Sequence, residues 1–115
     1  MTYEEKIQWL YDIEQIKRLK HRYCSFCDDN YKAEEISALF TENGIWEGGI
    51  FGRAEGRSAI YEFFKKIPSQ VSFANHYVTN PIIDITGDSA TGKWDLWEPI
   101  GNGEEAKCTL ARCEV

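Results

Sequence analysis

The chain has 115 residues, a length that fits one domain (residues 1–115) without a second independent core. Nineteen Asp and Glu residues against thirteen Lys and Arg give a formal net charge of −6, and phosphate binding needs clustered positive charge. We therefore expect neither nucleic acid nor an anionic membrane surface as a partner. The apolar runs are too short for a transmembrane helix or for the core of a signal peptide, so we expect a cytoplasmic protein.

The N-terminal third is predicted to be helical. Thr2 and Glu5 fit a capping box, and Asp12 with Gln15 fits a second one, which predicts a break or kink near Tyr11. Beyond that point apolar residues recur at steps of three and four, a pattern typical of a helix with one buried face. The residues of this stripe are Ile13, Ile16, Leu19, Tyr23 and Phe26.

The middle of the chain is predicted to alternate short helices with short strands. A second helix is expected over residues 33–40, ended by a turn at 41–44. Residues 45–46 suggest a short strand, and residues 50–51 suggest the start of another. A third helix is expected over residues 57–67, closed by Pro68.

Everything after Pro68 is predicted to be β-structure. Strands are expected over residues 71–79 and 82–86, interrupted at Asn80 and Pro81 because proline cannot donate to a ladder. A long strand over residues 90–100 and a final one over 106–115 follow, separated by glycine turns. Helices followed by a meander predict an α+β fold with helices on one face of a curved antiparallel sheet.

Four cysteines occur as two close pairs, Cys24 with Cys27 and Cys108 with Cys113. The C-x-x-C spacing of the first pair is compatible with zinc binding or redox chemistry, but the second pair has the wrong spacing for a zinc site. The first pair also lies within a strongly helical stretch. We therefore expect reduced thiols that bind no metal.

Four segments of the chain resemble the SnoaL-like branch of the nuclear-transport-factor-2-like (NTF2-like) superfamily. They are Arg22-Tyr23 with Asp28, residues 39–44 with Trp46, residues 52–60 (GRAEGRSAI), and residues 76–81 (HYVTNP). In order and spacing the likeness extends over about three quarters of the chain. It implies a cone-shaped, barrel-like fold in which a curved sheet wraps the N-terminal helices and leaves a deep apolar pocket.

The resemblance is sharper to the cofactor-independent dehydratases of this superfamily, such as scytalone dehydratase and bile acid 7α-dehydratase. These enzymes use an Asp–His pair, and the matching positions are Asp28 and His76, with Tyr23 matching a pocket tyrosine. In the roles that this implies, His76 takes a proton from carbon, Asp28 fixes its tautomer and stabilises the imidazolium, and Tyr23 donates a hydrogen bond to the substrate oxygen. No metal or organic cofactor is required.

The expected reaction is dehydration or isomerisation of a small hydrophobic cyclic alcohol or ketone. Trp46, Phe73 and Trp94 are the candidate substrate-binding residues of an apolar wall, although strand alternation lets only some aromatic residues face inward. Asp95 and Glu98 on the long strand alternate in side, so that at most one points into a cleft. Surface positions are expected for both.

Each candidate residue also has a structural explanation. His76 could be a hydrogen-bonded core histidine, Asp28 an ordinary turn residue, and Tyr23 a core residue of the helical stripe. On an ideal helix, five residues rotate Asp28 about 140° from Tyr23. Both reach one pocket only if the sheet curls around the helix or the helix loosens. The alternative functions are a non-catalytic module that binds a small ligand and a dimerisation module using the outer face of the sheet.

The end of the chain departs from the family pattern. SnoaL-like proteins usually continue through one more strand, so we expect the last strand of the fold to be missing and the domain to be truncated at its C-terminus. The strand could equally be supplied by a neighbouring subunit, or the chain could be a smaller variant with an exposed edge. Leu110 and Val115 beside an open edge favour pairing, so we expect a homodimer or higher homo-oligomer.

Overall fold

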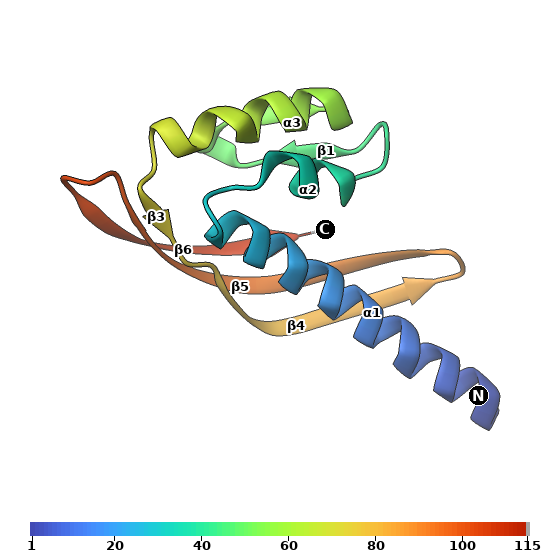
Figure 1. Ribbon diagram of the computed structural model, residues 1–115. Coiled ribbons are helices and arrows are strands. Elements are labelled where there is room, and N and C mark those ends of the chain that lie inside the picture. The colour runs from blue at the N-terminus through green and yellow to red at the C-terminus, as the bar shows by residue number, and fades with distance from the viewer. Residues whose placement is uncertain (115) are drawn as a thin grey trace.

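The computed structural model describes residues 1–114, and the side chains of residues 1–112, as helices packed on antiparallel sheets (Figure 1). The helices are α1 (Tyr3–Asp28), α2 (Ala33–Ala38) and α3 (Arg57–Lys66), with short 3-10 helices at Gly49–Phe51 and Ile67–Ser69. The strands are β1 (Ile45–Glu47), β2 (Arg53–Glu55), β3 (Phe73–Ala74), β4 (Tyr77–Thr86), β5 (Ser89–Gly101) and β6 (Ala106–Glu114). The predicted α+β class is confirmed, and the larger sheet is not closed into a barrel within these residues.

Helix α1 begins as the sequence predicts. The Thr2 hydroxyl accepts from the Glu5 backbone N–H, and the Glu5 carboxylate accepts from the Thr2 N–H, which completes the capping box. The predicted break near Tyr11 is wrong, because Asp12 accepts a hydrogen bond from Gln8 on the preceding turn instead of capping a new helix. The N-terminal half of α1 projects beyond the sheet (Figure 1), and no helix in residues 1–114 is long and apolar enough to cross a membrane.

The middle of the chain differs from the prediction in three details. Helix α2 ends at Ala38 rather than at residue 40, and residues 50–51 belong to a 3-10 helix, so that β2 begins only at Arg53 and pairs with β1. Pro68 does not end the helical structure, because a 3-10 helix follows α3 directly. It lies in the first turn of the 3-10 helix after α3, where its missing N–H costs nothing.

Strand β5 is the centre of the larger sheet. It pairs with β4 and β3 along one side and with β6 along the other, and every pairing is antiparallel. The expected strand over residues 71–79 is divided into β3 and the start of β4, with Asn75 and His76 between them, and β4 runs unbroken through Pro81. The predicted interruption is instead a register shift between Thr79 and Ile82, where Asn80 has a left-handed φ of 54°. Strand β6 forms an edge with Leu110 exposed, and self-association through it stays a prediction.

The core joins the C-terminal end of α1 to α2 and α3. Ile36 and Ile60 are fully buried, and Phe64 makes ring contacts with Tyr23, Tyr31, Trp46 and Phe63. Dense aromatic packing around one residue stabilises the whole cluster. It holds the last turns of α1 in place, so the side chains of Cys27 and Asp28 have fixed positions against the sheet.

Candidate active site

His76 lies between β3 and β4, opposite the C-terminal part of β5. The backbone N–H of Asn75 donates to the carbonyl of Pro99 over 3.0 Å, and Tyr77 pairs with Trp97. In an antiparallel pair the residue between these two positions faces the residue between their partners. The backbone therefore places His76 directly across from Glu98.

Asp28, the last residue of α1, holds His76 from the other side. One carboxylate oxygen, Oδ1, lies 2.6 Å from Nδ1 of the His76 ring and accepts the backbone N–H of His76 over 2.8 Å. Because ring and backbone are bound to the same atom, the orientation of the imidazole is fixed. The predicted juxtaposition of Asp28 and His76 is thus present, and their catalytic roles stay predictions.

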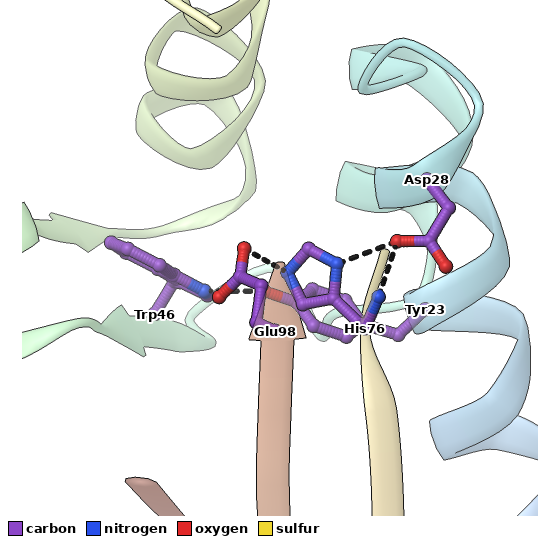
Figure 2. Close-up of polar contacts among 5 residues, drawn as sticks. All are labelled: Tyr23, Asp28, Trp46, His76 and Glu98. Carbon is purple, nitrogen blue, oxygen red and sulfur yellow. Dashed lines mark hydrogen bonds and ion pairs between the residues drawn. The ribbon is translucent and has the colours of Figure 1, made fainter. Parts of the chain in front are cut away.

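Glu98 was expected on the surface, and that expectation is wrong. Its residue is 8% exposed, and Oε2 lies 3.0 Å from Nε2 of His76, so that the ring is bound by a carboxylate at each nitrogen (Figure 2). Trp94 precedes Glu98 by four residues, and an even spacing places both on one face of a strand. Since Trp94 was expected to face inward, that parity was the signal in the sequence that could have found Glu98.

The surroundings of His76 favour its charged form. Burial acts to lower the pKa of His76, but the hydrogen bond and negative charge of Glu98, followed by those of Asp28, outweigh it and raise the pKa above its ordinary value of 6.5. The His76 and Glu98 side chains are each 10% exposed and the Asp28 side chain 27%, so solvent screens these charges weakly. The imidazolium form of His76, with a carboxylate at each ring nitrogen, is therefore favoured more than in an ordinary histidine.

Tyr23 points into the core instead of sharing the surroundings of Asp28. Its hydroxyl oxygen accepts from Nε1 of Trp46 over 2.7 Å, and its ring meets Phe40 and Phe64 edge-on. Burial raises the pKa of Tyr23, so the phenol stays neutral. The rotation between Tyr23 and Asp28 along α1 thus separates their surroundings, and donation from Tyr23 to a substrate oxygen stays a prediction.

Replacing Tyr23 with Phe is expected to destabilise the protein by about 1–3 kcal/mol, because the half-buried indole N–H of Trp46 loses its acceptor. Urea unfolding measures the loss. The matched control is Tyr11→Phe on the exposed part of α1, which should change the free energy of unfolding by less than about 0.5 kcal/mol. Equal stabilities of the two variants would contradict a structural role for the Tyr23 hydroxyl.

An open hollow of about 440 Å³ lies beside Asp28 and His76. It is formed by the last turns of α1 and the start of β4, and its walls mix polar and apolar side chains. The lining residues are His21, Cys24, Ser25, Asp28, His76, Tyr77, Val78 and Thr79. A small molecule in this hollow would lie against Asp28 and His76.

The three aromatic residues expected to form the substrate wall do not line this hollow. Trp46 packs against Phe63 with ring centroids 4.6 Å apart, and Phe73 is 47% exposed. Trp94 is buried, and its indole N–H has no hydrogen-bond partner among the described side chains. Their contact with substrate stays a prediction.

The sequence profile of the SnoaL-like domain matches residues 8–114. The chain belongs to the SnoaL-like domain family. This confirms the resemblance of the four segments, and solved structures show the same NTF2-like fold. A comparison with curated proteins gives no match.

Three solved structures illustrate the likeness. A candidate scytalone dehydratase from Novosphingobium aromaticivorans is 22% identical with a TM-score of 0.81, and the match covers 90% of this chain and 70% of that one. A candidate aromatic ring hydroxylase from the same organism is 23% identical with a TM-score of 0.79, covering 86% and 72%. A candidate dehydratase of the NTF2-like family from Streptomyces avermitilis is 17% identical with a TM-score of 0.75, covering 90% and 82%. The names of these proteins refer to different reactions. A shared fold therefore does not identify the reaction, which has to be inferred from the residues of the site.

Proposed function

We propose that this SnoaL-like protein is a cofactor-independent acid–base catalyst, a dehydratase-type lyase or an isomerase, acting on a small hydrophobic cyclic alcohol or ketone. The observation that carries the proposal is the binding of His76 by Asp28 at both ring and backbone, beside an open hollow. A histidine held in one orientation by a carboxylate is suited to proton transfer near neutral pH. The candidate dehydratases among the structures of the same fold support this choice of reaction class.

The proton balance follows from the two ring nitrogens. In the neutral ring, Nδ1–H donates to Asp28 and Nε2 accepts the proton of a carbon next to a carbonyl group. The electron pair of the broken C–H bond forms a double bond, and Asp28 stabilises the imidazolium. In dehydration the imidazolium returns its proton to the departing hydroxyl, which leaves as water. In isomerisation the proton returns to a different carbon of the same substrate.

One observation favours the second candidate, a module that binds a small ligand or pairs with a second copy without catalysis. Both nitrogens of His76 are occupied, and a buried ion triad of this kind is also found as a structural element. This candidate predicts that His76→Gln keeps full ligand binding and that the wild-type protein transfers no proton.

Deuterium exchange separates the two candidates before the natural substrate is known. The protein is incubated in D₂O with a panel of cyclic β-hydroxy ketones and β,γ-unsaturated ketones, and mass spectrometry reads deuterium at carbon. We expect exchange that His76→Ala abolishes, while Glu104→Gln in the exposed β5–β6 turn retains it. Binding of panel members without any exchange would contradict the catalytic proposal and favour the binding module.

A further inference from the structure

Glu98 is fixed against His76 by the backbone of the sheet. The Asn75–Pro99 hydrogen bond and the Tyr77–Trp97 pair lie on either side of the His76–Glu98 contact. Glu98 does not line the hollow beside Asp28, so a molecule bound there meets His76 and not Glu98. Glu98 therefore acts on that molecule only through the imidazole.

The 3.0 Å contact between Nε2 and Oε2 requires a proton. A bare ring nitrogen facing a bare carboxylate oxygen is a contact between two lone pairs, which burial makes costly. A proton on Nε2 removes this clash, and with Nδ1–H donating to Asp28 the ring is then an imidazolium between two carboxylates. In that state, Nε2 cannot accept a proton from carbon until its contact with Glu98 opens.

Two further titratable groups near His76 are neutral. Cys27 on α1 and Tyr31 after α1 both have pKa values raised by burial, so neither carries charge near neutral pH. Tyr31 meets the imidazole edge-on with ring centroids 6.2 Å apart. Cys24, His21 and Tyr77 share the hollow with the ring. The charges that act most strongly on His76 are those of Asp28 and Glu98.

We propose that Glu98 is a positioning residue of the acid–base site, which holds a proton on Nε2 of His76 and thereby sets the pH at which that nitrogen accepts a proton from substrate. The inference rests on the proposed function, because it assigns Glu98 a part in the same proton transfer. Asp28 orients the ring, and Glu98 competes with the substrate for its reactive nitrogen. At low pH the contact is closed, and raising the pH frees Nε2.

Two measurements on the full chain test this proposal. The ¹⁵N NMR signals of His76 report which ring nitrogens carry protons, and their pH titration is recorded for the wild type, Glu98→Gln and Glu98→Asp, with Glu104→Gln as the control. The pH profile of deuterium exchange is recorded for the same proteins. We expect both nitrogens of wild-type His76 to be protonated at neutral pH. In Glu98→Gln, the titration and the rising limb of the exchange profile should move together to lower pH, with Glu98→Asp between the two and Glu104→Gln unchanged.

An unprotonated Nε2 in the wild type at neutral pH would overturn the proposal, and this measurement needs no variant to fold. A Glu98→Gln titration that moves while the exchange profile stays in place would overturn it as well, by reducing Glu98 to a structural partner. A wild-type protein that exchanges no panel compound overturns the proposed function instead. The titration then still decides whether Glu98 holds the proton on Nε2.

Discussion

Asp28→Asn is expected to slow deuterium exchange at carbon by about 10²- to 10⁴-fold while panel compounds still bind. The asparagine side chain can accept the same hydrogen bonds from the ring and backbone of His76, but it carries no charge to stabilise the imidazolium that forms when the ring takes a proton. The variant therefore separates the charge of Asp28 from its shape. Exchange rates and binding constants are measured on the same preparations.

The neighbouring residue supplies the control for this variant. Asp29 pairs with Lys32 over 3.6 Å on the surface, and such exposed pairs contribute little. The Asp29→Asn protein should therefore catalyse deuterium exchange at carbon at the wild-type rate. A folded Asp28→Asn protein within threefold of the wild-type rate would contradict the assigned role of the Asp28 charge.

His76→Ala is expected to cost about 3–5 kcal/mol of stability near pH 6, since it leaves Asp28 and Glu98 as buried carboxylates without their shared cation. The pKa of His76 is raised in the folded state, so its contribution is complete below the unfolded value of 6.5 and is lost as the pH rises through the folded value. The stability difference between wild type and variant should therefore shrink as the pH rises from about 6 through the folded-state pKa of His76.

Urea unfolding of both proteins across that pH range measures this effect. The exposed histidine on α1 provides the control, and His21→Ala should change stability by less than about 0.5 kcal/mol. A stability difference that grows with pH would mean that His76 is neutral in the folded protein. That result would contradict an imidazolium between Asp28 and Glu98.

The parts of the fold that follow from local patterns were predictable from the sequence. The capping box at Thr2, the helix after Gly56 and the long strand before Gly101 depend on neighbouring residues, and each is present close to its expected bounds. The differences arise where tertiary contacts override a local signal. The register of β5 carries β4 through Pro81, whereas α1 continues past Asp12 because Asp12 accepts a hydrogen bond from Gln8 within the helix.

The candidate site was predictable only in part. The resemblance of four segments to SnoaL-like proteins predicted that Asp28 and His76 lie close together, although 48 positions separate them in the sequence. The even spacing to Trp94 indicates the face of β5 on which Glu98 lies, but its pairing with His76 depends on strand register, which joins residues about twenty positions apart. The hollow beside Asp28 depends on which faces of α1 and β4 meet, so its lining could not be foreseen from aromatic content.

The most direct test compares the pH at which His76 loses its proton with the pH at which proton transfer to and from the substrate begins. In the wild-type protein, the ¹⁵N titration of His76 and the pH profile of deuterium exchange are measured on one sample. The account predicts a common midpoint above the ordinary histidine value of 6.5, with exchange rising as the imidazolium loses its proton. Exchange that rises at a pH where His76 does not titrate, or that persists in His76→Ala, would contradict it.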